Sequence, residues 1–257
     1  ASSFGLRCSM GTNAVLISEI KADELKSAGL RSGIVSLDGL EEKHNLIRGR
    51  SSFQLTLEGI ERLRVRDIDV RVNVVVMRSN LSDIVPIVEW LAKRNVPVFM
   101  RRLILSGRAF SSSDEMLSAT DYADLRARLK PLLDDQRGLV GGHYLKERHV
   151  TTRFPLPFAR KDCSAGHRGL VILPDGKVQT CGFLGPLGEM GVGTLPAESL
   201  SVIWSRLNGS DHILALENRL GQYNGSTSGP KTNCLAVALS GQEPLVRTHL
   251  PMMEVSP

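Results

Sequence analysis

The sequence is short of cysteine and of aromatic residues. Its 257 residues include four cysteines, and aromatic side chains make up 5% of the chain. Four cysteines over this length are too few for the disulfide scaffold that small secreted domains use. The lysines and arginines are scattered with few aromatic residues among them, so a net charge of +5 does not by itself indicate nucleic-acid binding. A mildly basic chain of this kind suits an anionic ligand or a peptide partner.

Long apolar runs are also missing. No stretch approaches the ~20 apolar residues that a helix needs to cross a bilayer. No charged segment followed by an apolar one opens the chain, as it would in a secretory signal. We therefore expect a cytoplasmic protein without a membrane partner. The apolar fraction of 42% can form a sizeable core, in one large domain or two modest ones.

The first half of the chain contains a regular alternation of apolar strands and amphipathic helices. Apolar and β-branched runs predict strands at residues 6–12, 33–37, 68–77 and 97–105. Apolar residues at helical spacing predict helices at residues 22–30, 52–65, 81–95 and 119–135. The candidate N-caps are Ser51 or Ser52 and Thr120 or Asp121, and Ser82 lies near the start of the helix at 81–95. Strands that alternate with helices at this spacing form parallel βαβ units, so the predicted fold class is α/β.

The alternation stops after residue 137. Residues 138–160 are rich in glycine and proline, which predicts a linker. Residues 169–184 form two apolar runs around Pro-Asp-Gly, a hairpin signal, and residues 198–207 predict a short helix. We therefore expect a first domain at 1–137, a linker at 138–160 and a small α+β domain at 161–257.

Polar motifs follow several of the predicted strands, at residues 12–14, 36–39, 44–49 and 106–109. The carboxyl ends of parallel strands converge on one rim, where barrel and open-sheet enzymes bind their ligands. Residues two apart on a strand point to the same side, so Ser36 and Asp38 could together hold a ribose diol or an amino group. Taken alone, each motif is more often a turn or a cap. The order and spacing of the whole set favour a binding rim.

That set resembles a known family. The segments TNAVLI at residues 12–17 and GIVSLDGLEEKHNLIRGRSSF at 33–53, followed by a helix, an apolar strand and GRA at 107–109, resemble the partial (β/α) barrel of radical S-adenosylmethionine (SAM) enzymes. The similarity is to the second half of that barrel, and it is nearest to members that modify peptides and proteins. Ala14 departs from the Thr-Asn-Gly triplet that is usual in the family.

The resemblance implies four cofactor-binding residues. Ser36 would lie at the ribose or methionine region of SAM, with Asp38 close by. Asn13 and Arg48 would line the same rim, and the planar guanidinium of Arg48 suits the SAM carboxylate.

The family's cysteine loop is missing from the sequence. The loop has the pattern CxxxCxxC and holds the 4Fe–4S cluster to which SAM binds, and a Gly-Gly-Glu-Pro-like segment normally follows it. Neither motif occurs here. We therefore expect an N-terminally truncated barrel that lacks its first strands. Such a barrel would expose the edge of residues 6–12, which favours aggregation.

Three cysteines in the second half indicate a further metal site, because soft thiolates suit iron–sulfur or zinc coordination. Cys163 and Cys181 flank the predicted hairpin and Cys234 follows it, in an arrangement that resembles an auxiliary 4Fe–4S domain of the twitch or SPASM type. No fourth cysteine accompanies them. A non-cysteine ligand, a lost cluster, a zinc site and buried free cysteines are the alternatives. Three histidines without ligand-like spacing are expected to be surface or packing residues: His143, His149 and His167.

The resemblance therefore implies a radical SAM maturase. Such an enzyme cleaves SAM to a 5′-deoxyadenosyl radical, which abstracts hydrogen from a peptide or protein substrate, and it takes electrons from a reductant such as flavodoxin or ferredoxin. Without the cysteine motif this chain alone is expected to be inactive. The alternative is a degenerate, non-catalytic homologue that binds a peptide or another partner on the half-barrel.

Overall fold

The computed structural model describes residues 1–49, 51–105, 107–109, 111–135, 140–142, 165–166, 169–183, 191–207 and 218. The chain divides into two compact units, one formed by Ala1–Leu103 with Asp114–Leu156 and the other by Ile104–Ser113 with Pro157–Pro257. Each unit is described by itself. Within the described residues, no helix is both long and apolar enough to span a membrane.

The first unit is built on a five-stranded parallel sheet in which the strands follow one another in chain order. Its strands are β1 (Cys8–Thr12), β2 (Leu30–Ser36), β3 (Asp69–Val76), β4 (Val98–Arg102) and β5 (Val140–Gly142). Its helices are α1 (Glu19–Ser27), α2 (Glu41–Arg48), α3 (Ser52–Arg64), α4 (Ile84–Ala92) and α5 (Ala119–Asp135), and 3₁₀ turns lie at Ser2–Phe4 and Arg78–Asp83. A further 3₁₀ turn, Gly107–Ala109, belongs to the second unit, and Ser113–Glu115 spans the boundary.

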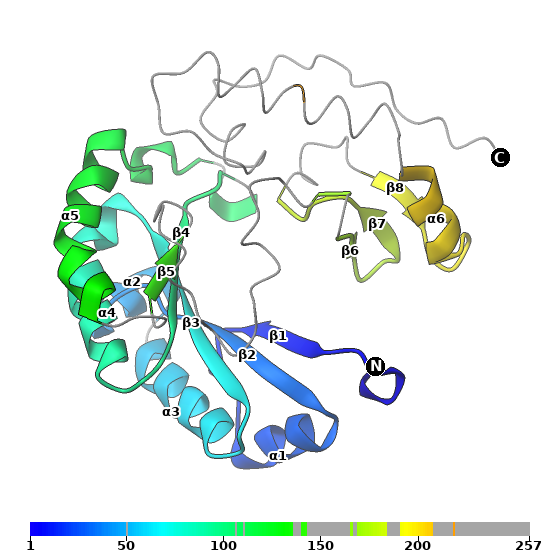
Figure 1. Ribbon diagram of the computed structural model, residues 1–257, viewed down its shortest axis with the longest axis horizontal. Coiled ribbons are helices and arrows are strands. Elements are labelled where there is room, and N and C mark those ends of the chain that lie inside the picture. The colour runs from blue at the N-terminus through cyan, green and yellow to red at the C-terminus, as the bar shows by residue number, and fades with distance from the viewer. Residues whose placement is uncertain are drawn as a thin grey trace. The chain divides into compact units, whose positions relative to one another are not determined.

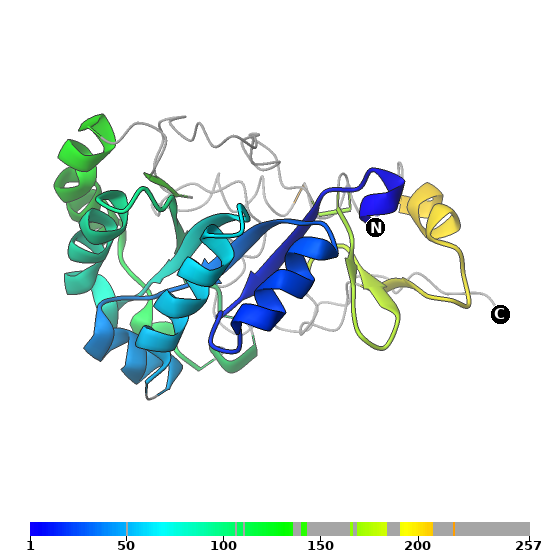
Figure 2. The ribbon, with the colours of Figure 1, turned by 90° about the horizontal axis from the view of Figure 1, so that it is seen from below.

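The helices α1, α3, α4 and α5 cover one face of this sheet (Figures 1 and 2). A sheet wound in a single direction with its helices on one face is an arc of a (β/α) barrel, whereas a doubly wound sheet reverses its strand order and carries helices on both faces. The predicted α/β partial barrel is therefore confirmed.

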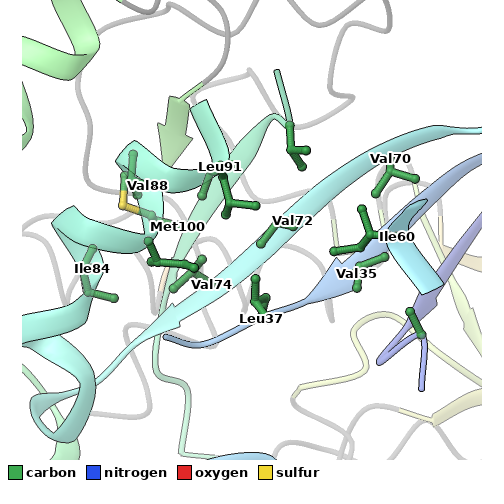
Figure 3. Packing of buried hydrophobic residues seen from close by; sticks show 14 of the residues in the cluster. Val35, Leu37, Ile60, Val70, Val72, Val74, Ile84, Val88, Leu91 and Met100 are labelled. Atoms are coloured by element: carbon green, nitrogen blue, oxygen red, sulfur yellow. The ribbon is translucent and has the colours of Figure 1, made fainter. Parts of the chain in front are cut away.

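The core lies between the sheet and these helices. On β3, the side chains of Val70, Val72, Val74 and Val76 are buried, while those between them are half-buried on the opposite, inner face. This two-residue alternation is what a strand with two different faces requires. Figure 3 shows the helix-facing valines of β3 packed with residues of β2, β4, α3 and α4: Val35, Leu37, Ile60, Ile84, Val88, Leu91 and Met100.

The structure corrects some element ends near α1 and α3. Helix α1 begins three residues before the predicted range because the Ser18 hydroxyl accepts a hydrogen bond from the Lys21 N–H at 3.1 Å. At α3, Ser51 occupies the N-cap position without a side-chain cap. The capping acceptor is instead the Asn45 side chain, whose Oδ1 receives the Phe53 N–H at 2.9 Å. A helix end can be capped by a residue from outside it, which local sequence does not reveal.

Two further predictions need correction. The cap of α5 is Ser118, whose hydroxyl accepts from the Asp121 N–H at 3.1 Å, while the Asp121 carboxylate accepts the Ser118 N–H at 2.8 Å. Asp121 is therefore the third-position partner of a capping box rather than the cap itself, and Thr120 is not the cap. The segment at 138–160, predicted to be a linker, supplies strand β5, which pairs with β4 as the fifth strand.

The described part of the second unit is a small antiparallel sheet of β6 (Val171–Ile172), β7 (Lys177–Gln179) and β8 (Gly191–Thr194), followed by α6 (Leu200–Leu207). The hairpin at Pro-Asp-Gly is confirmed. Gly176 turns the chain at a φ of 85°, and its N–H donates to the Leu173 carbonyl at 2.9 Å. Helix α6 confirms the helix predicted at 198–207.

Candidate functional site at the rim of the half-barrel

The turn after β1 is fixed by hydrogen bonds from its own polar residues. The Thr12 hydroxyl accepts the Ala14 N–H at 2.9 Å, and Asn13 Oδ1 accepts the Val15 N–H at 3.2 Å. From α3, the Thr56 hydroxyl donates to the Asn13 carbonyl at 2.9 Å. Asn13 as a whole is exposed.

Ala14 and Gly59 make this turn possible. Ala14 has a φ of 61°, in the left-handed region that favours glycine, which gives a physical reason for the glycine that is usual at this place in the resembled family. On α3, a Cβ placed on Gly59 would lie 2.3 Å from the Ala14 carbonyl oxygen. Only glycine at position 59 lets the turn rest directly on the helix.

Behind β2, Asp38 is the centre of a buried network. Its side chain is 1% exposed, and its Oδ1 accepts the Val75 N–H from β3 at 2.9 Å. Its other oxygen, Oδ2, accepts the Arg48 Nε–H from α2 at 2.6 Å. Asp38 therefore ties β2, β3 and α2 together, and both of its carboxylate oxygens are used within the protein.

His44 and Asn80 complete this network, which we call the rim network (Asp38, His44, Arg48 and Asn80). His44 Nδ1 accepts the Asp38 N–H at 3.2 Å, so the ring is an acceptor at this atom. Burial lowers the pKa of His44 to about 4, an effect opposed by the Asp38 charge and assisted by that of Arg48. The Asn80 amide donates to the Asp38 carbonyl at 2.7 Å and to the Val75 carbonyl at 2.8 Å.

These contacts bear on the four residues predicted to bind SAM. Strand β2 ends at Ser36, so strand alternation does not place Asp38 on the same side as Ser36, and Asp38 is closed to solvent. Arg48 is paired with Asp38, but 30% of its side chain remains exposed. Ser36 is half-buried at the carboxyl end of β2, and Asn13 is exposed after β1. Ser36 and Asn13 keep a surface that a ligand can reach, and the binding roles of all four residues stay predictions.

The inner face of the sheet carries charged residues that the sequence analysis did not select. Arg71 on β3 and Arg101 on β4, which we call the arginine pair, both approach the ring of Phe99, with Cζ 5.9 Å and 5.2 Å from its centroid. Arg101 Nε–H also donates to Asn73 Oδ1 at 2.9 Å. The sequence did contain a signal for this polar inner face, because valine alternates with polar residues in the first part of DVRVNVVV.

The cysteines proposed as metal ligands are only partly within the described residues. Cys181 follows β7 and is half-buried, whereas Cys163 and Cys234 lie outside the described part of the chain. No group of three potential metal ligands occurs among the residues that the structure describes. The auxiliary cluster stays a prediction, as do the roles of His143, His149 and His167, which also lie outside these residues.

The fold and the polar rim define a class of protein: a (β/α) half-barrel with a ligand-binding edge at the carboxyl ends of its strands. Residues 2–91 match the family model described as "Radical SAM superfamily". This region is similar to the radical SAM superfamily, and the resemblance inferred from the rim motifs is confirmed for it.

Three known proteins show how far the similarity extends. The chain is 28% identical over 228 residues to the AdoMet-dependent heme synthase of Nitratidesulfovibrio vulgaris, a match that covers 81% of this chain and 60% of that protein. It is 31% identical over 116 residues to the Fe-coproporphyrin III synthase of Methanosarcina barkeri, covering 44% of this chain and 29% of that one. The solved structure of native anSMEcpe with bound AdoMet and the Cp18Cys peptide superposes with a TM-score of 0.56 at 17% identity, over 77% of this chain and 57% of that one.

Proposed function

We propose that the protein is a radical SAM enzyme whose substrate is a carboxylate-bearing tetrapyrrole. The observation that carries the proposal is the polar inner face of the half-barrel. A closed (β/α) barrel fills these positions with branched aliphatic side chains. Here β3 and β4 place Arg71, Asn73 and Arg101 there instead, beside Ser36 at the end of β2. Such a face is suited to a polar, anionic ligand.

The residues present fit SAM in part. The Ser36 hydroxyl lies at the carboxyl end of β2 and pairs in register with Asn73 of β3, so both side chains are on the inner face. The exposed Asn13 and the side chain of Arg48, which is 30% exposed, would supply further donors from neighbouring rim segments. When bound to a reduced iron–sulfur cluster, SAM supplies the 5′-deoxyadenosyl radical for hydrogen abstraction. The described residues contain no group of cysteines that could hold that cluster.

The tetrapyrrole class is supported by the curated relatives. Two of them are named for heme and for Fe-coproporphyrin III, which carry propionate side chains, and the first matches 81% of this chain. The chain spans only 60% of that heme synthase, so the activity of the whole protein is part of the proposal. In such an enzyme, a flavodoxin- or ferredoxin-type reductant supplies the electron.

A peptide or protein substrate, as the sequence predicts, is the second candidate. It is supported by the peptide in the anSMEcpe structure, which shares the fold at 17% identity. The degenerate, non-catalytic alternative is supported by the missing CxxxCxxC motif. A tetrapyrrole is favoured over a peptide because an arginine pair at an aromatic ring suits carboxylates carried next to a flat ring system.

Equilibrium dialysis against labelled SAM tests the cofactor side of the proposal. We expect the wild-type chain to bind SAM and Ser36→Ala to bind it about 5–10-fold more weakly, the cost of one lost hydrogen bond. Ser27→Ala, the same change at the exposed end of α1, is the matched control and should bind like the wild type. No binding by the wild type, or equal binding by Ser36→Ala, would contradict the proposal.

A turnover assay distinguishes the proposed enzyme from a non-catalytic binding module. The complete product of the gene, loaded anaerobically with iron and sulfide and then reduced, should release 5′-deoxyadenosine in the presence of coproporphyrin III. The binding-module alternative predicts that none is released. Release with an acidic peptide but not with the porphyrin would support the second candidate.

A further inference from the structure

The arginine pair lies where the strand register brings two inner-face positions together. Asn73 of β3 pairs with Phe99 of β4, Arg71 lies two residues before Asn73, and Arg101 two residues after Phe99. Residues two apart share a face. Along the strands, Arg71 therefore lies on one side of the Asn73–Phe99 pair and Arg101 on the other. Both guanidinium groups approach the Phe99 ring.

Arg71 is not balanced by a negative charge within the described residues. Its Nε atom is buried and has no hydrogen-bond partner. The nearest acidic residue on the same face of β3, Asp69, is exposed and forms no ion pair with it. The residue as a whole is half-buried. Burying part of a cation without a partner is costly, so the unsatisfied Nε needs an explanation outside the protein's own packing.

The second arginine increases that cost. Burial lowers the pKa of Arg71, and the like charge of Arg101 lowers it further. Arg101 is oriented by its bond to Asn73, and the contacts of both guanidinium groups with the Phe99 ring offset only part of their repulsion. A carboxylate placed between the two arginines would offset both costs, because the planar fork of arginine matches its two oxygens.

We propose that Arg71 and Arg101 form a subsite for a carboxylate of the substrate, with Phe99 contacting the apolar part that carries it. The subsite rests on the proposed function, since it takes the inner face as the place where substrate binds. The subsite goes beyond the proposed function because it names the substrate group that is recognised and the residues that recognise it.

A fluorescence titration with coproporphyrin III, a tetra-acid, and with its tetramethyl ester tests the subsite. We expect the wild-type chain to bind the acid at least 10-fold more tightly than the ester. Arg71→Met should lose most of this preference, and Arg71→Lys, which keeps the charge but not the fork, should fall between the two. Arg94→Met removes an arginine stacked 3.7 Å from the Trp90 ring centroid on α4 and is the matched control, with the wild-type preference.

The outcomes separate the subsite from the proposed function. Failure of the acid to bind, equal affinities for acid and ester, or a full preference in Arg71→Met would overturn the subsite. SAM affinity is measured on the same variants, and we expect Arg71→Met to leave it unchanged. A fall in SAM affinity with an intact acid preference would assign the arginines to SAM and overturn the subsite. A wild type that prefers the acid but does not bind SAM would retain the subsite and contradict the proposed function.

Discussion

The rim network and the arginine pair are both polar, and both lie on the same half-barrel, but they differ in how their charges are satisfied. In the rim network, Asp38 is 1% exposed and both of its oxygens are hydrogen-bonded, to Val75 and Arg48. In the arginine pair, Arg71 has a buried nitrogen with no partner. A fully satisfied buried network holds elements in place, whereas an unsatisfied one has capacity left for a ligand. The comparison indicates a scaffolding role for the rim network and supports the proposed binding role of Arg71.

The largest expected effect comes from a substitution that disrupts the rim network. Asp38→Ala leaves the Val75 N–H and the Arg48 guanidinium without their acceptor, and we expect a loss of about 4 kcal/mol in the free energy of unfolding. In the same denaturant titrations, Arg71→Met should leave stability unchanged or raise it, because it removes an unpaired buried cation.

The control for Asp38→Ala is Glu24→Ala, which removes a carboxylate that pairs with Lys21 where both side chains are more than half exposed. Exposed pairs of this kind contribute little, so its unfolding curve should overlay that of the wild type. If Arg71→Met destabilised the protein as much as Asp38→Ala does, the arginine would be a structural residue and the comparison would fail.

The next effect tests the close contact that supports the rim. Gly59→Ala places a methyl group where the Ala14 carbonyl oxygen lies at 2.3 Å, and backbone cannot move aside as a side-chain end can. We expect a loss of about 3 kcal/mol in the free energy of unfolding. Gly11→Ala is the control, because no atom lies within 4 Å of its Cβ position, and it should cost almost nothing. Equal stability of the two variants would show that the turn shifts freely.

The fold was largely predictable because its information is local. Strands predicted at 68–77 and 97–105 are found at Asp69–Val76 and Val98–Arg102, since β-branched residues alternate with polar ones over the whole length of β3. Helix α2 was not predicted, because its polar sequence EEKHNLIR was interpreted only as a rim motif. Strand β5 was missed because three residues, two of them glycine, give too short a pattern.

The site was less predictable because its chemistry depends on contacts between distant residues. Asp38 is buried by bonds to Val75 and Asn80, 37 and 42 residues further along the chain, so its motif did not distinguish a ligand from an anchor. The arginine pair depends on the register of β3 with β4, which sets Arg71 and Arg101 around one ring. Composition and spacing do not fix such a register.

A pH titration measures how much the rim network depends on a neutral histidine. Burial lowers the pKa of His44 from 6.5 to about 4, so between these values the unfolded chain takes up a proton that the folded protein does not. Stability from this group is complete above pH 6.5 and falls as the pH drops toward 4. Between pH 7 and pH 4, a shift of this size changes the stability by about 3 kcal/mol.

His44→Gln keeps an acceptor for the Asp38 N–H but does not titrate. The difference in unfolding free energy between wild type and this variant should therefore change by that amount between pH 7 and pH 4, while contributions from carboxylates cancel. A constant difference across this range would mean that folding does not lower the pKa of His44.

The smallest effect concerns the left-handed turn at Ala14. Its φ of 61° costs a residue with a Cβ about 1–2 kcal/mol, and glycine removes that cost while losing about 0.5–1 kcal/mol of chain entropy. We expect Ala14→Gly to stabilise the protein by about 0.5 kcal/mol in denaturant unfolding. Ala22→Gly, at a buried alanine of helix α1, is the opposite control and should destabilise it. Ala14→Gly should not rescue Gly59→Ala, because the overlap is with the carbonyl oxygen, which both residues carry.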